Sequence, residues 1–202
     1  MFTGLIQGLG TVIEVDRRCA PDARLQLETS YQDLVLGESL AVNGVCLTVA
    51  DLDGSRFGAV ASAETLRLTT LGELERGSRT HLERAIRAGD PIGGHLVTGH
   101  VDGVGRLLAL GPVGDSVTMT VEVPVELASL VAPKGSIAVD GTSLTVNLAA
   151  GRVFEVMLVP YTRRATLLDK RPIGSRVNLE VDLLAKYVAR VLGKPGVDGR
   201  PT

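Results

Sequence analysis

The residue best placed for proton chemistry is His100. It lies in the segment Thr98–Asp102, between Gly99 and Gly103, and glycines let a ligand approach the backbone closely. An imidazole gains and loses a proton near neutral pH, so His100 is a candidate general acid or base. A hydrogen-bonded structural histidine is the alternative interpretation.

The other two histidines stand in less suggestive contexts. His95 directly follows two glycines at the joint between two similar halves of the chain, and we interpret it as a linker residue, with a role in a site as the alternative. His81 aligns with an asparagine in the second half, and we interpret it as a surface residue of a strand.

A thiol and a hydroxyl occupy matching positions in the two halves. Cys46 and Ser143 each follow a turn signal, Asn43-Gly44 and Asp140-Gly141, at the start of an apolar run. Both side chains are suited to the mouth of a pocket, and a small buried core residue is the alternative for each.

Two further residues are candidates for ligand contact. Lys134 precedes a glycine and is suited to bind a carbonyl or phosphate oxygen, although most lysines only solvate a surface. Phe2 belongs to a chain with 3% aromatic residues. It is suited to stack on a flat heterocycle, with a core position as the alternative.

These candidates are positioned by an internal duplication. Three ordered blocks of the first half align with three of the second: 1–10 with 96–105, 39–49 with 136–146, and 77–83 with 174–180. Each copy consists of short apolar runs rich in Val, Leu and Thr, separated by turn signals. This pattern predicts an all-β protein with a small antiparallel barrel or sandwich formed twice. We also expect short helices over 31–36, 65–71 and 125–131.

The second copy ends differently. Apolar residues from Leu183 to Leu192 recur at helical spacing, and Asp182 is placed to cap the helix. The apolar face either folds back onto its own barrel or packs against other copies of the chain. We divide the chain into 1–95, 96–182 and 183–202, and expect the Gly- and Pro-rich tail 193–202 to be frayed.

Composition excludes several classes of partner. Lys and Arg total 21 against 23 Asp and Glu, and the net charge of -2 disfavours nucleic acid and anionic membranes. No secretion signal or long apolar segment is evident, so we expect a cytoplasmic protein. Cys19 and Cys46 lack CxxC spacing, so we expect free thiols, no disulfide and no metal site.

Chemistry that treats two ligands differently must come from positions at which the copies differ. Polar or reactive groups are common among these positions, which pair Phe2 with Val97, Leu5 with His100, Gly37 with Lys134, Cys46 with Ser143, and Glu64 with Tyr161.

Five blocks of the chain resemble the riboflavin synthase family: MFTGLI at 1–6, VNGVCLTV at 42–49, GGHLVTGHVD at 93–102, IAVDGTSLTVN at 137–147 and VNLEVDLLAKY at 177–187. The resemblance implies two tandem six-stranded Greek-key β-barrels with a C-terminal α-helix that holds a homotrimer. It implies a transferase that converts two molecules of 6,7-dimethyl-8-ribityllumazine into riboflavin and 5-amino-6-(D-ribitylamino)uracil, the final step of riboflavin biosynthesis, without metal or cofactor. Association with lumazine synthase is a further implied partnership. Two related pockets would hold the two lumazines face to face at low entropic cost.

The resemblance also implies site residues. The N-terminal barrel would bind lumazine through Gly4, Leu5, Ile6, Ser39, Cys46, Leu47, Thr48, Val60, Ala61, Ser62, Ala63, Glu64 and Thr65. The C-terminal barrel would use His100, Val101, Asp102, Lys134, Ser143, Leu144, Thr145, Leu158, Val159, Pro160, Tyr161, Thr162 and Arg163.

The expected catalytic residues are His100, Cys46, Ser143, Phe2 and Asp182. His100 would assist deprotonation of the C7 methyl group of the donor, with Ser143 or Thr145 holding the ring. Cys46 or a water would add to the other molecule, and Phe2 would cover the site.

Two positions depart from the family pattern, and two other functions compete. Tyr161 stands where many relatives have His and alters a pocket wall, and Thr70 stands where many have Asn. A non-catalytic relative that holds a lumazine or flavin as an optical antenna is the main rival, but such relatives tend to lose the second pocket. An oligonucleotide-binding barrel would need basic grooves and stacking aromatics, and this chain has no Trp.

Overall fold

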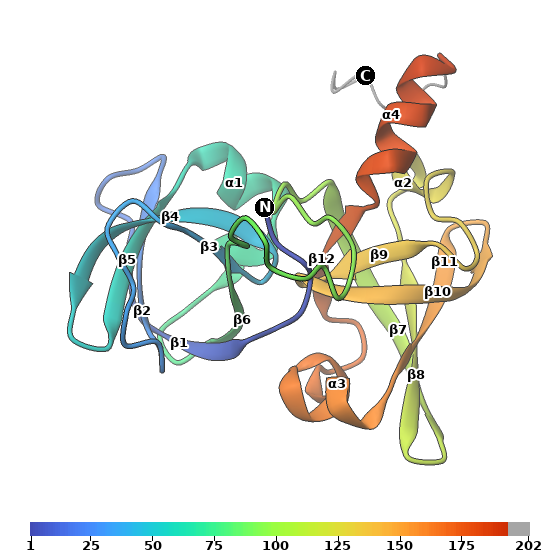
Figure 1. Cartoon of the computed structure of the whole chain (residues 1–202), viewed down its shortest axis with the longest axis horizontal. Helices are drawn as coiled ribbons and strands as arrows, with labels where there is room; N and C mark the ends of the chain where they lie inside the picture. The colour runs from blue at the N-terminus through green and yellow to red at the C-terminus, as the bar shows by residue number, and fades with distance from the viewer. Residues whose placement is uncertain (194–202) are drawn as a thin grey trace.

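The computed structural model describes residues 1–193 and consists of two closed antiparallel barrels of six strands each, followed by a helix (Figure 1). Residues 194–202 of the tail that we expected to be frayed lie outside the described residues. The N-terminal barrel has the strand order β1-β2-β5-β4-β3-β6, and the C-terminal barrel closes in the equivalent order through β7 to β12. In the first barrel β3, β4 and β5 are consecutive neighbours, and β2 returns beside β5. This is the Greek-key arrangement, as expected.

The strands have the following bounds. The first barrel contains β1 (Gly8–Asp16), β2 (Ala23–Glu28), β3 (Ser39–Val42), β4 (Val45–Asp53), β5 (Arg56–Ala61) and β6 (Arg79–Arg84). The second contains β7 (Gly103–Val113), β8 (Ser116–Glu122), β9 (Ser136–Val139), β10 (Thr142–Ala150), β11 (Val153–Leu158) and β12 (Arg176–Val181).

Short helices connect the strands. They are α1 (Ala63–Leu68), η1 (Thr70–Glu73), α2 (Val125–Ala128), α3 (Pro160–Ala165) and η2 (Leu168–Lys170). The helices expected near 65–71 and 125–131 are present with shifted bounds. The helix expected over 31–36 was wrong: this segment is a loop, and the Arg84 guanidinium pairs with Asp33 of the loop at 2.7 Å and with Glu38, just after it, at 2.9 Å.

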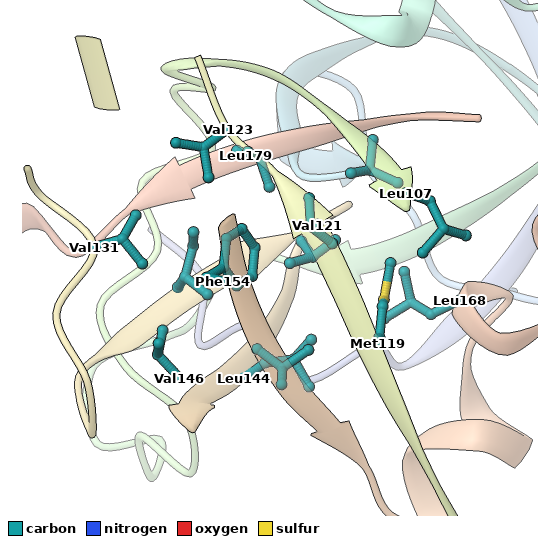
Figure 2. Close-up of a cluster of buried hydrophobic side chains, with 14 of the residues drawn as sticks. Leu107, Met119, Val121, Val123, Val131, Leu144, Val146, Phe154, Leu168 and Leu179 are labelled. Carbon is teal, nitrogen blue, oxygen red and sulfur yellow. The ribbon is translucent and has the colours of Figure 1, made fainter. Parts of the chain in front are cut away.

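Each barrel is filled by its own alternating strands. Along β4, Val45, Leu47 and Val49 point inward, while Cys46 and Thr48 point outward. This period of two is the pattern of a strand with one buried face. In the second barrel Phe154 lies among Val121, Leu144 and their neighbours (Figure 2). The inner faces therefore form a separate core in each barrel, and the side chains that could contact a ligand project from the outer faces.

The final helix, α4 (Leu183–Val191), begins at Asp182, whose carboxylate accepts a hydrogen bond from the Leu184 N–H at 2.9 Å. It extends away from the barrels (Figure 1), and its apolar side chains Leu184, Tyr187, Val188 and Val191 are 57–85% exposed. Folding back onto its own barrel, one of our two alternatives, is therefore wrong. Within residues 1–193, every helix is too short or too polar to cross a bilayer.

Candidate active site

Two buried carboxylates fix the loops that precede the barrels. Glu83 on β6 accepts hydrogen bonds from the Thr3 N–H at 2.7 Å, the Thr3 hydroxyl at 2.8 Å and the Gly4 N–H at 3.1 Å. Glu180 on β12 binds Thr98 and Gly99 in the same way, at 2.7, 2.7 and 3.0 Å. Burial raises the pKa of both carboxyls, and these hydrogen bonds oppose the rise. Each loop is thus held at its base by its own barrel.

Beyond this anchor, each loop crosses to the other barrel. The Ser143 N–H donates to the Gly4 carbonyl at 2.7 Å, and the Cys46 N–H donates to the Gly99 carbonyl at 2.9 Å. A Cβ on Gly4 would lie 2.6 Å from the Ser143 Cβ, and one on Gly99 would lie 2.5 Å from the Cys46 Cβ. Both positions require glycine, because they also have φ of +75° and +81°.

We take the outer surface around each crossing as a candidate composite site. The first combines Cys46 and Thr48 of β4 with the loop that carries His100, whose neighbour Val101 packs against the N-terminal core. We call it the Cys46 site. The second combines Ser143 and Thr145 of β10 with the loop of Gly4 and Leu5, and we call it the Ser143 site. Our assignment of the Gly4 loop to the N-terminal pocket and of the His100 loop to the C-terminal pocket was therefore wrong.

His95 lies at the Ser143 site, which agrees with our alternative interpretation of it and not with that of a linker residue. Its Nδ1 lies 2.7 Å from the Ser143 hydroxyl, and its Nε2 is buried with no hydrogen-bond partner among the described residues. Burial lowers the pKa of His95, with the negative charge of Asp182 opposing the change. A neutral imidazole beside a hydroxyl is suited to hold or move a proton at the Ser143 oxygen. The two glycines before His95 were the available signal, because a Cβ on Gly94 would lie 2.9 Å from that oxygen.

The lumazine binding domain model matches residues 3–85 and 98–182, one match for each barrel. Riboflavin synthase of Mycobacterium tuberculosis is 46% identical over 203 residues, covering 97% of this chain and all of the relative. Riboflavin synthase of Brucella abortus is 43% identical over 198 residues, covering 95% of this chain and 98% of the relative. The chain belongs to the riboflavin synthase family.

A solved structure has the same fold as this riboflavin synthase family member. The crystal structure of LumP complexed with 6,7-dimethyl-8-(1'-D-ribityl) lumazine aligns with a TM-score of 0.81 and 22% identity, covering 90% of this chain and 99% of LumP. At this identity the likeness shows the fold alone.

Several residues carried over from the family pattern point away from the composite sites. Leu47, Ala61, Leu144 and Leu158 are at most 6% exposed and lie in the barrel cores. Their side chains point into the cores, so any contact of these residues with a ligand on the outer surface would be made by their backbone atoms, and they stay predictions in that form. Their outward neighbours Thr48 and Thr145 are exposed and stay predicted contacts.

The structure also corrects our prediction for Phe2. It is fully buried at the junction of the barrels, where it forms a β-bridge with Val97 and packs against Ala41 and Ala138. The expectation that it covers the site or stacks on a heterocycle was wrong. Apolar contacts with both barrels make it part of their interface instead.

Three polar residues that we predicted in the sites make structural contacts. Asp102 accepts from the Val181 N–H at 2.9 Å and pairs with Lys186 at 2.7 Å, so it joins β12 to α4. Arg163 binds Asp169 at 2.9 Å and the Asp115 carbonyl at 2.7 Å. Asp182 caps α4, and its negative charge lies near enough to His95 to oppose the fall in the pKa of that imidazole; its predicted catalytic role stays a prediction.

The remaining predicted residues lie on outer surfaces. His100 and Tyr161 are exposed, as are Val60, Ser62, Glu64, Val159, Pro160 and Lys134. Leu5 is exposed, while Ile6, Ser39, Ala63, Thr65 and Thr162 are half-buried. All stay predictions as ligand contacts. Cys19 and Cys46 are free thiols, and within residues 1–193 no cluster of three His, Cys, Asp or Glu residues is suited to a metal ion.

Proposed function

We propose that the chain catalyses the dismutation of two molecules of 6,7-dimethyl-8-ribityllumazine into riboflavin and 5-amino-6-(D-ribitylamino)uracil. One observation carries the proposal. The two copies build composite sites of the same backbone design but equip them with unlike polar groups, Cys46 with His100 in one and Ser143 with His95 in the other. The shared design suits one heterocycle bound twice, and the unlike groups allow one molecule to donate carbon and the other to accept it. The near-full-length likeness to riboflavin synthases supports this assignment.

The proposed reaction needs two unlike sites face to face, which a trimer would supply. The exposed apolar face of α4 is the natural trimer contact, because isolated apolar helix faces of this kind are covered in oligomers. The Cys46 site of one subunit would then face the Ser143 site of its neighbour. The functional division into 1–95, 96–182 and 183–202, a cytoplasmic location and association with lumazine synthase belong to the same proposal.

Within such a pair of sites, the residues have distinct roles. His100 takes a proton from the C7 methyl group of the donor, and the resulting carbanion attacks the acceptor. Cys46 or a water adds to the acceptor bound in the Cys46 site, and the same nucleophile is expelled with its proton before riboflavin is released, so that it is not consumed. Ser143, held by His95, positions the ring of the donor together with Thr145.

The proposal is tested by single variants with a matched thiol control. H100A should lower turnover about 100-fold or more, the typical contribution of a general acid or base, while lumazine fluorescence titration still shows binding. C46A should also lower turnover, and C19A should not, because Cys19 lies on an exposed turn far along the chain from the site. Full turnover in both H100A and C46A would remove these two residues from the mechanism.

An optical-antenna protein is the competing function, because solved structures of LumP hold lumazine, riboflavin or flavin mononucleotide on the same fold. Incubating the purified chain with the lumazine distinguishes the two functions. Growth of riboflavin absorbance supports the enzyme, whereas tight binding with no riboflavin formed would leave the binding protein.

A further inference from the structure

His81 connects the two barrels. It is fully buried on β6 of the N-terminal barrel, yet both ring nitrogens bind backbone atoms of the C-terminal half. Nδ1 lies 2.8 Å from the Asp140 carbonyl oxygen, and the Leu167 N–H donates to Nε2 at 2.8 Å. Our interpretation of His81 as a surface residue was therefore wrong.

Asn178 on β12 of the C-terminal barrel makes the equivalent contacts with backbone atoms of the N-terminal half. Its Nδ2 donates to the Asn43 carbonyl at 2.8 Å, and its Oδ1 accepts from the Thr70 N–H at 2.7 Å. His81 aligns with Asn178 in the duplication, and Asp140 aligns with Asn43. Each copy thus sends one donor and one acceptor into the other, and the four bonds form one clasp between the barrels.

The two halves of this clasp differ in their response to protons. A carboxamide is a donor and an acceptor at every ordinary pH, whereas an imidazole is both only when it is neutral. A carbonyl only accepts and an N–H only donates, so the partners fix His81 as the neutral ring protonated at Nδ1. Protonation would place an N–H at Nε2, directly against the N–H of Leu167, and the bond would be lost.

Two charged groups face this part of the clasp. Asp140, on the turn between β9 and β10, is fully buried, and Arg171, which follows η2, pairs with its carboxylate at 2.5 Å. Burial is the main cause that lowers the pKa of His81. Asp140 opposes the shift and Arg171 adds to it.

We propose that His81 is a proton-sensitive latch that docks the two barrels when neutral and releases them when protonated. The latch reaches both composite sites. The turns Asn43-Gly44 and Asp140-Gly141 pack against each other, and they lead directly into the strands that carry Cys46 and Ser143. Acid that opens the latch therefore disturbs the crossing contacts at Gly99 and Gly4.

The sign of the effect follows from the depressed pKa. The unfolded chain binds a proton at His81 below its ordinary pKa of about 6.5, while the docked form resists it. His81 therefore lowers the folding equilibrium constant as pH falls below this value, by up to about tenfold per pH unit, until the pKa of the docked form is reached.

The variant His81→Asn copies the chemistry of Asn178 and cannot titrate. We expect unfolding at matched pH values between about 7.5 and 5.0 to show a steeper acid loss of stability in the wild type than in H81N, with a difference of about tenfold at pH 5.5. His95 also has a lowered pKa and is present in both proteins, so the difference between them isolates His81. Equal pH dependence in the two proteins would overturn the latch.

A measurement on the wild-type chain keeps the test independent of how well H81N folds. Nitrogen-15 shifts of the imidazole should show His81 protonated at Nδ1 alone at neutral pH. Its protonation on acidification should coincide with loss of the barrel junction, followed through the Phe2 and Val97 resonances. Ordinary titration near pH 6.5 with those resonances unchanged would refute the proposal.

Discussion

Substituting Gly99 with alanine probes the crossing of loop and strand at the Cys46 site. The new Cβ would lie 2.5 Å from the Cys46 Cβ and 2.9 Å from its backbone N, at a φ of +81°. Left-handed backbone costs an alanine about 1–2 kcal/mol, and overpacking of this kind costs about 1–3 kcal/mol more. We therefore expect G99A to lose about 2–5 kcal/mol of unfolding free energy in a urea titration.

Gly54→Ala is the matched control. Gly54 also has a positive φ, +59°, but among the described residues its Cβ would meet no heavy atom within 4 Å other than its chain neighbours. It should therefore lose only the backbone contribution of about 1–2 kcal/mol and keep its turnover. G99A should in addition lose turnover at saturating lumazine, because its loop carries His100. Equal losses of stability in the two variants would refute the crossing contact as a close-packed element of the site.

Two other predictions concern the anchor and the helix. Glu83→Gln places an amide N–H₂ where the Gly4 N–H or the Thr3 donors need an acceptor. This substitution should cost about 1–3 kcal/mol of unfolding free energy. A stability equal to the wild type would show that the loop is held by other contacts. Leu184→Ser combined with Val191→Ser, at 70% and 85% exposed positions of α4, should convert a trimer into monomers in sedimentation velocity. Val113→Ser, 51% exposed on the end of β7, should leave the trimer intact, and an unchanged trimer in the α4 variant would exclude the helix as the contact.

The barrels were accessible to sequence reasoning because the duplication shows which features serve the fold. Asn43-Gly44 and Asp140-Gly141 recur and adopt the positive φ values that their turns require. The inward direction of the Leu47 and Leu144 side chains was predictable, because a strand that points Cys46 and Thr48 outward must point Leu47 inward. Family motifs include such core residues, and only the period of two separates them from ligand contacts.

The buried polar residues were not accessible in the same way. His81 lies in β6, a strand of mostly polar residues whose burial does not alternate, so periodicity could not show that its side chain is buried, and its partners are 59 and 86 residues away. His95 follows two glycines and has the local sequence of a linker, yet its partner Ser143 is 48 residues further along the chain. Hydrogen bonds over such separations are set by how the barrels dock.

The crossing of the loops gives the duplication its functional meaning. Alignment of the copies equates Gly4 with Gly99 and Cys46 with Ser143, and this alignment is the same whether each loop serves its own barrel or the other one. In the structure each loop is anchored to its own barrel through Glu83 or Glu180, and its Gly4 or Gly99 carbonyl accepts a hydrogen bond from an N–H group of the other barrel. Neither barrel alone therefore contains a complete set of the proposed site residues, and docking of the barrels is a condition for the proposed chemistry. A titratable group at the centre of that docking, His81, is consequently positioned to affect both sites at once.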